Sequence, residues 1–371
     1  MTDPSLYTPR TIENFETIGF ADNFTLPGDD CRVLGKASLT SYDTRFNVLA
    51  GNVANMVGCN QSSLNRLLVI VGKDNVARVY ENFPMSMQIV AKRDIKAGTA
   101  VFDSDIADIT EINFSDAVAS LSPEDEEKII WIFREGFTFG IYFDLTGKLI
   151  KENIPGELAH TFLQVRYFNL YRTLSDESAK KLLNYGWFPF AQVLGKDFEA
   201  IHSLIEQEKY DKIAGWLEQE FSNERVEKFT NGWWSNSHFS EKENILTEGL
   251  DCFYNKQYSA SISTLTPMIE GIANSYYHQT TGKGIGYSGG SIAKAISDIS
   301  TSKFSPSSLT FPSLFKAYLE SYFYKNTKSS VSDENVRNTV SHGRASQESF
   351  THENSLKLIL TLDQMRFYMT S

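Results

Sequence analysis

The chain has 371 residues, with 46 acidic and 35 basic side chains and a formal net charge of −11. This balance excludes a protein that coats nucleic acid through a broad basic surface, although it permits a small basic site on an acidic body. Three widely spaced cysteines without a CxxC pair fit a reduced cytosolic protein better than a disulfide framework or a zinc site. With no secretory signal and no apolar run long enough to span a bilayer, we expect a soluble cytoplasmic protein without a membrane partner.

The first 150 residues carry the β signals. Short β-branched and aromatic runs separated by glycine, proline and asparagine are typical of strands. The expected strands are 67–71, 76–80, 87–92, 99–102, 128–134 and 137–143. The last two are separated only by Glu135 and Gly136, which predicts a hairpin. Residues 1–150 are therefore expected to form a β-rich domain.

An acidic stretch interrupts this region. Between residues 103 and 127 there are nine acids and no lysine or arginine. We interpret the stretch as a solvated face or loop. A carboxylate metal site is the minority alternative, because no histidine lies nearby and the spacing is irregular.

Residues 151–236 show helical spacing. Leu158, Phe162 and Val165 recur at i, i+4 and i+7 behind Pro155, which suits the first turn of a helix. Further short helices are expected from 176 and over 198–205, 210–221 and 225–230. The four tryptophans of this region are expected to pack in a core and not to stack on a ligand. They are Trp187, Trp216, Trp233 and Trp234.

Residues 237–371 are expected to form an antiparallel helical bundle, which makes the whole chain α+β. Ser240 and Glu243 have the spacing of a capping box, and Thr351 is placed to cap the last helix. Pro267 should kink or restart the helix that contains it. The glycine-rich 282–290 lacks the order of a phosphate-binding loop and is interpreted as an interhelical loop.

One group between the last two expected helices carries chemistry. Arg337 keeps its charge and can bind phosphate oxygens through two N–H groups, while His342 titrates near neutral pH and can move a proton. Five residues apart on one straight helix, the two side chains would lie about 140° apart. They converge only if the arginine projects from the first turn or if another surface completes the site. The alternative is a helix-end histidine beside a salt-bridging arginine.

The residues around this pair resemble the end of HEPN domains (higher eukaryotes and prokaryotes nucleotide-binding). That family is marked by Arg, a polar residue such as Asn, and His four to six residues after the arginine, which Arg337, Asn338 and His342 match. The flanks match as well, through His-Gly-Arg at 342–344 and Glu-Asn-Ser-Leu-Lys at 353–357, which opens an apolar helix with Asp363. Upstream, 260–272 is similar to an early bundle helix of bacterial members. The resemblance covers 238–371, about a third of the chain.

The resemblance implies a homodimeric helical bundle that cleaves RNA without metal or cofactor. In that reaction the 2′-hydroxyl attacks the adjacent phosphate. His342 would act as general acid or base, and Arg337 would stabilise the charge on the phosphoryl oxygens. Asn338 would orient the pair or bind phosphate, with Ser341 and Arg344 in support. Many members are endoribonucleases of toxin, phage-defence and RNA-processing systems, so a role in bacterial defence or stress response is expected.

Two alternatives stay open at this point. The bundle would be a catalytically inactive dimerisation or nucleotide-binding adaptor if Arg337 and His342 are structural. The β-rich domain would be a sensor, regulator or partner-binding module with a protein or small-molecule ligand. That this domain is itself a small-molecule enzyme is a third reading, which no residues support.

Overall fold

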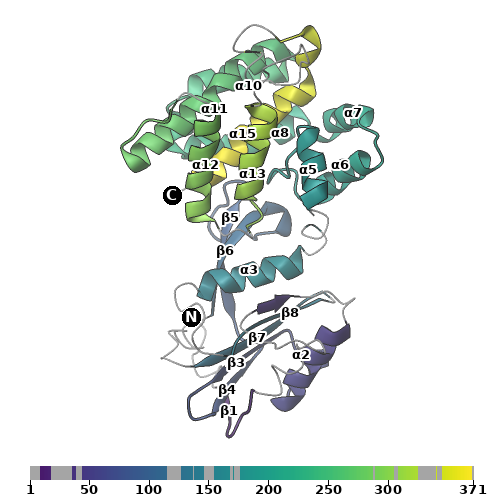
Figure 1. Cartoon of the computed structure of the whole chain (residues 1–371), viewed down its shortest axis with the longest axis vertical. Helices are drawn as coiled ribbons and strands as arrows, with labels where there is room; N and C mark the ends of the chain where they lie inside the picture. The colour runs from purple at the N-terminus through teal and green to yellow at the C-terminus, as the bar shows by residue number, and fades with distance from the viewer. Residues whose placement is uncertain are drawn as a thin grey trace. The chain divides into compact units, whose positions relative to one another are not determined.

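The computed structural model describes residues 9–17, 36–38, 44–114, 127–136, 138–145, 154–167, 170, 176–286, 289–304, 308–324, 340 and 345–369. The chain is α+β, with an N-terminal sheet region followed by mostly helical structure (Figure 1). It forms two compact units. The first comprises Met1–Ile89 and Ile109–Thr173, and the second comprises Val90–Asp108 and Leu174–Ser371. The divisions expected at residues 150 and 236 stay predictions.

The first unit contains a six-stranded sheet in the order β1-β4-β3-β7-β8-β2, and every neighbouring pair is antiparallel. The strands are β1 (Arg10–Ile12), β2 (Lys36–Ser38), β3 (Arg66–Val71), β4 (Ala77–Glu81), β7 (Lys128–Glu135) and β8 (Thr138–Asp144). In the β7–β8 hairpin Glu135 pairs with Thr138. Gly136 adopts a φ of 58°, which a glycine accepts without strain.

Two helices pack on this sheet, α2 (Thr44–Met56) and α3 (Ile154–Arg166). Ile130 and Ile132 of β7 share a buried core with the apolar residues of α2. Alternate residues of a strand point to opposite faces, so Trp131 and Phe133 face the other way. The Phe133 ring lies 5.2 Å from the ring of Phe162 of α3. The two helices therefore cover opposite faces of the sheet.

A separate two-stranded ribbon joins β5 (Met85–Ala91) and β6 (Ile106–Phe114). Residues 90–108 at the end of this ribbon belong to the second unit. There Val90 and Ala107 pack against Ala191 and Phe367. The ribbon end is thus part of the hydrophobic core of the second unit.

The strand predictions at 67–71, 76–80, 87–92 and the hairpin are confirmed. The prediction at 99–102 was wrong, because this segment belongs to the loop between β5 and β6, where Phe102 N donates to Asp105 Oδ2. The loop interpretation of the acidic stretch was also wrong over Ile106–Phe114, which is strand β6. Asp108 can lie in a buried strand because Ser308 Oγ and Leu309 N donate to its carboxylate. Residues 115–126 of the stretch lie outside the described residues.

The second unit is built from helices. They are α5 (Asp176–Asn184), α6 (Lys196–Glu206), α7 (Asp211–Glu220), α8 (Asn223–Thr230), α9 (Ser237–Ser240), α10 (Glu243–Tyr254), α11 (Tyr258–Thr281), α12 (Gly289–Lys303), α13 (Pro312–Tyr318) and α15 (His352–Tyr368). A π-helical turn, η6 (Leu319–Phe323), follows α13, and a 3₁₀ turn, η7 (Gln347–Ser349), precedes α15. Every residue of α15 from Ser355 to Tyr368 is buried, and α7, α10, α11 and α12 contact it (Figure 1).

The expected helices are present, with three corrections. Asn236 caps α9, and α10 begins after Lys242, so Ser240 does not open a helix with a capping box. Pro267 lies inside α11, which continues through it, so the predicted restart was wrong, whereas the predicted kink stays a prediction. Helix α12 was not predicted. Thr351 caps α15 as expected, accepting from Asn354 N at 3.1 Å.

Two further expectations concern burial. Trp187 and Trp233 are buried as predicted, whereas Trp216 and Trp234 are partly exposed. Within the described ranges, no helix combines the length and apolar character needed to cross a membrane.

Candidate functional site

The residues predicted to act on RNA lie outside the described residues. They are Arg337, Asn338, Ser341, His342 and Arg344. The chain on both sides of them is described, up to Tyr324 and again from Ala345.

Both flanks reach a cluster of side chains at the start of α15, which we call the loop-base cluster. Its members come from the third residue after α5, from η6 and from the first turns of α15. They are Trp187, Tyr322, Glu353, Asn354 and Lys357.

Lys357 is the charged centre of the loop-base cluster. Its side chain is 5% exposed and its Nζ lies 2.7 Å from Glu353 Oε1. The same Nζ donates to Tyr185 O at 3.3 Å and lies over the rings of Trp187 (4.7 Å) and Tyr322 (5.1 Å). Trp187 Nε1 also donates to Glu353 Oε1, at 3.2 Å. A carboxylate, a carbonyl and two aromatic faces thus offset the cost of burying this ammonium.

Asn354 joins the two flanks of the predicted site. Its Oδ1 accepts a hydrogen bond from Tyr322 OH, and its Nδ2 donates to Ser349 O, both at 2.9 Å. Tyr322 precedes the segment that carries Arg337 and His342, and Ser349 follows it. One amide side chain therefore holds both ends of that segment.

The place of Tyr322 depends on a glycine. Gly186 has a φ of +68°, and a Cβ there would lie 2.2 Å from the Tyr322 ring. Tyr322 also stacks on Tyr318, with ring centroids 5.6 Å apart and an interplanar angle of 22°. The glycine thus lets the ring lie directly against the backbone after α5.

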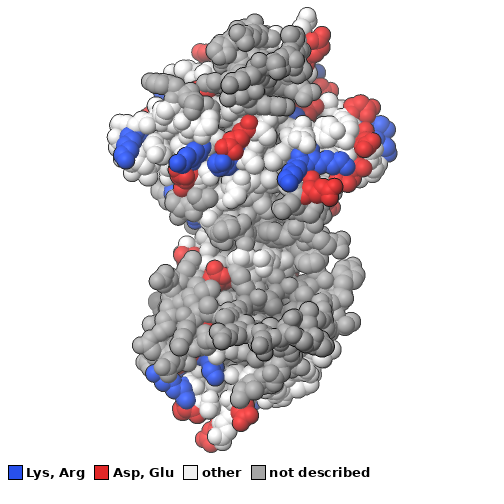
Figure 2. Space-filling model, in the orientation of Figure 1, with Lys and Arg blue, Asp and Glu red and all other residues white. Residues whose placement is uncertain are grey.

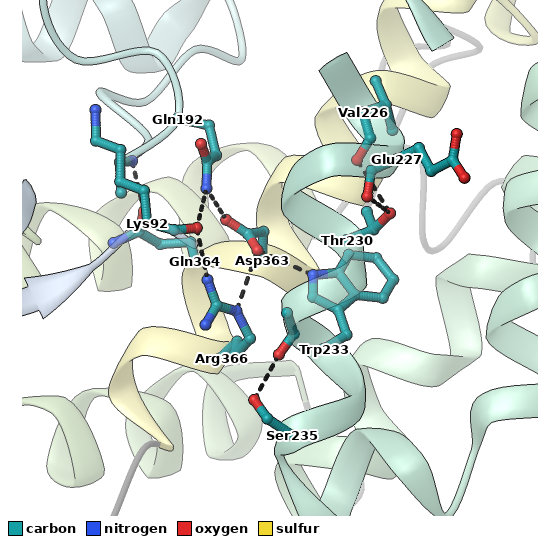
Figure 3. A network of polar contacts seen from close by, with 12 residues as sticks. Lys92, Gln192, Val226, Glu227, Thr230, Trp233, Ser235, Asp363, Gln364 and Arg366 are labelled. Atoms are coloured by element: carbon teal, nitrogen blue, oxygen red, sulfur yellow. Dashed lines mark hydrogen bonds and ion pairs between the residues drawn. The ribbon is translucent and has the colours of Figure 1, made fainter. Parts of the chain in front are cut away.

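A second polar network lies in the C-terminal half of α15 (Figure 3). Asp363, 1% exposed, accepts from Trp233 Nε1 (2.9 Å), Gln192 Nε2 (2.9 Å) and Arg366 Nε (3.3 Å). Gln192 and Arg366 also donate to the carbonyl of Lys92, at 3.2 and 3.3 Å. These hydrogen bonds bind the ribbon end to α15 and to the residues before α6 and α9.

The carbonyl of Lys92 accepts two hydrogen bonds, but the Nζ of its side chain has no hydrogen-bond or ion-pair partner among the described residues. Burial lowers the pKa of Lys92 from 10.5 to about 8, and the nearby positive charge of Arg225 adds to the shift. The carboxylates of Asp197, Asp363 and Asp105 act in the opposite direction.

The histidines that the structure describes have structural or exposed positions. Burial lowers the pKa of His202, His238 and His352. His238 Nδ1 hydrogen bonds with Ser275 Oγ at 2.9 Å, and His352 packs against the rings of Phe253 and Tyr258. None of these three joins the loop-base cluster.

Two expectations bear on the described residues, a metal site and the absence of a broad basic surface. No group of three or more His, Cys, Asp or Glu there is placed to hold a metal ion. On the face shown in Figure 2, the described lysines and arginines are interspersed with acidic and uncharged residues. Described residues 282–286 of the glycine-rich segment are not helical, as expected, whereas Gly289 and Gly290 already belong to α12, so the loop interpretation was wrong there.

Sequence reasoning missed the loop-base cluster, although one signal was available. Lys357 stands in the apolar run Leu356-Lys357-Leu358-Ile359-Leu360, four residues after Glu353. A single lysine in such a run, with an acid one turn earlier, indicates a buried ion pair. The partners Trp187 and Tyr322 are distant in sequence and carry no local signal.

Comparisons of the chain with protein-family models, with curated proteins and with solved structures found no match.

Proposed function

We propose that this protein is a metal-independent endoribonuclease of the HEPN type that acts in bacterial defence, as a toxin or in a stress response. The proposal starts from the match of Arg337, Asn338 and His342 to the family motif. The observation that carries it further is the hydrogen bonding of Asn354 to Tyr322 and Ser349, which braces the two flanks of the motif segment.

The helical surroundings support the same proposal. Over 237–369 the described residues are helices and their connections, with α10, α11 and α12 in contact with α15. The motif segment connects α13 and η6 to α15, so it joins two parts of one helical assembly. A short catalytic segment braced by a rigid scaffold is the usual way to hold reactive groups in place.

The proposed reaction needs two roles. His342 transfers a proton to or from the 2′-hydroxyl or the 5′-oxygen leaving group. Arg337 stabilises the charge that builds on the phosphoryl oxygens, with Asn338, Ser341 and Arg344 in support. Two copies of the chain, paired through the C-terminal bundle, bring two motifs to one cleft. The first unit serves as the sensor or regulatory module.

The test is RNA cleavage by the full chain with EDTA present. We expect wild type to produce 2′,3′-cyclic phosphate ends, and His342→Ala to be slower by at least about 100-fold, the lower end of general acid–base catalysis. His278→Ala is the matched control, because His278 is an exposed histidine of α11 in the same unit.

Equal cleavage by wild type and His342→Ala contradicts the proposal. Nucleotide binding or dimerisation without cleavage would instead support the inactive adaptor.

A further inference from the structure

Lys92 follows strand β5 and lies at the ribbon end that belongs to the second unit. Its backbone is fixed there, because its N–H donates to Asp105 O at 2.8 Å and its carbonyl accepts from Gln192 and Arg366. Its side chain is partly exposed, and its Nζ has no hydrogen-bond or ion-pair partner among the described residues. The amine therefore has a defined place in the fold but no group that compensates its charge.

Three aspartates act on the charge of Lys92, and each of them already pairs with an arginine of the same unit. The pairs are Asp197 with Arg225, Asp105 with Arg93 (Oδ1–Nε 2.7 Å, Oδ2–Nη2 3.0 Å) and Asp363 with Arg366 (Oδ1–Nε 3.3 Å). These pairs carry no net charge, and Lys228 of α8 adds a further positive charge near Asp105. An ammonium at Lys92 is therefore positive charge in excess, whereas a neutral group there leaves the charges of the three pairs balanced.

We propose that Lys92 is a site of covalent acylation by small activated acyl donors of the acyl phosphate and acyl thioester classes. The neutral amine attacks the acyl carbon, so that a C–N bond forms. The bond from that carbon to the phosphate oxygen or the thiol sulfur breaks, and the leaving group takes the electron pair and the proton that the nitrogen loses. The product is a neutral amide, so acylation removes the excess positive charge at every pH.

The supply of neutral amine favours Lys92 over an ordinary lysine. Burial, helped by the charge of Arg225, lowers its pKa from 10.5 to about 8, so at pH 7 its neutral fraction is about 300 times that of an unperturbed lysine. A weaker base is also a weaker nucleophile, which offsets part of that gain. We therefore expect a net advantage in rate on the order of 10-fold at neutral pH.

The test measures the acetylation rate of each lysine in the full chain by mass spectrometry. Acetyl phosphate is the donor in one arm and acetyl-coenzyme A in the other. At pH 7 we expect Lys92 to react on the order of 10-fold faster than Lys294, which is exposed on α12. As the pH rises to 10, the rate at Lys92 should level off above about pH 8, while the rate at Lys294 keeps rising, because each rate follows the neutral fraction of its amine.

Two outcomes overturn the proposal. The first is a rate at Lys92 no faster than at Lys294 in both arms. The second is a rate at Lys92 that keeps rising up to pH 10, because the ammonium would then have a partner in solution, such as the buried Asp197 Oδ1, which has no hydrogen-bond partner. A faster reaction in one arm only supports the site and assigns its donor class.

The stability of the protein gives a second readout, which does not depend on RNA cleavage. Acetylated wild type should have a higher denaturant midpoint than unmodified protein at pH 7, and the two midpoints should converge towards pH 10, where the folded protein holds Lys92 neutral without modification. Lys92→Gln, a neutral amide like the product, should show the higher midpoint without any reagent. Lys92→Arg keeps the charge and cannot be acylated at this position. If acetylation shifts the midpoints of wild type and Lys92→Arg equally, modification of other lysines is responsible and the role of Lys92 is overturned.

Discussion

Two lysines of the second unit show how burial and pairing affect the stability of a charged ammonium group. Lys357 is surrounded by a carboxylate, a carbonyl and two aromatic rings. Lys92 is partly buried without any such acceptor for its Nζ in the described part of the chain, and its pKa falls to about 8. Burial without pairing disfavours the charged form, whereas pairing offsets that cost.

Lys92 predicts a pH-dependent stability. Its pKa is near 10.5 in the unfolded chain and about 8 in the folded protein, so between these values the unfolded state binds more protons. The cost to stability is complete below pH 8 and is relieved as the pH rises from 8 towards 10.5. We expect Lys92→Met to be more stable than wild type by about 1–2 kcal/mol at pH 7.

The difference in unfolding free energy between Lys92→Met and wild type should become smaller as the pH rises from 7 to 10. Denaturant unfolding curves recorded at several pH values measure it. Lys294→Met is the control, because Lys294 is exposed on α12. A difference between Lys92→Met and wild type that is constant from pH 7 to pH 10 would contradict the expectation.

At the level of elements, local pattern was informative wherever the partners of an element are close in sequence or where one face is apolar. Strand β3 and the β7–β8 hairpin were predictable because alternation and a glycine turn are local signals. Strand β6 was not, because the partners that allow Asp108 to be buried lie two hundred residues away, at Ser308 and Leu309. Helix α12 was missed because glycine and serine obscure the spacing of Ile292, Ile296 and Ile299.

In the candidate site, too, only the features with a local sequence pattern could be predicted. The motif residues and the Thr351 cap were visible in the sequence, because each is a short pattern. The loop-base cluster was not, since Trp187 and Glu353 are 166 residues apart. The last helix and its cap were expected, but its burial on all sides was not, because the neighbours that surround α15 come from distant parts of the chain.

The corrected start of α10 leads to a prediction about the residues that cap the short helix before it. Asn236 accepts from His238 N as the cap, whereas Ser240 Oγ donates to Ser237 O inside the short helix and caps nothing. We therefore expect Asn236→Ala to cost about 1–2 kcal/mol of unfolding free energy and Ser240→Ala less than about 0.5 kcal/mol. Denaturant midpoints of the two variants would measure this. Equal losses of stability in the two variants would contradict this expectation and would favour the capping box predicted from Ser240 and Glu243.

At the scale of the whole molecule, the ribbon of β5 and β6 gives the first unit a covalent connection to the core of the second. Its end is bound to α15 through the carbonyl of Lys92 and the side chains of Gln192 and Arg366. The opposite end of α15 carries Asn354 and the flanks of the proposed catalytic segment. Within the second unit, a single buried helix therefore connects the ribbon end to the loop-base cluster.

The proposed dimer makes the last prediction. If one cleft needs His342 from both copies, a mixed dimer of wild type and His342→Ala is inactive. Activity should then fall with the square of the wild-type fraction, to about a quarter in an equal mixture. Independent sites would leave about half.

The two chains must be denatured and refolded together before RNA cleavage is measured, so that subunits exchange. A mixture of wild type with Arg344→Ala tests whether this supporting residue is also shared. Linear dependence on the wild-type fraction for His342→Ala would mean that each copy carries a complete site. Arg337 and His342 of one chain would then have to converge without help from the partner copy.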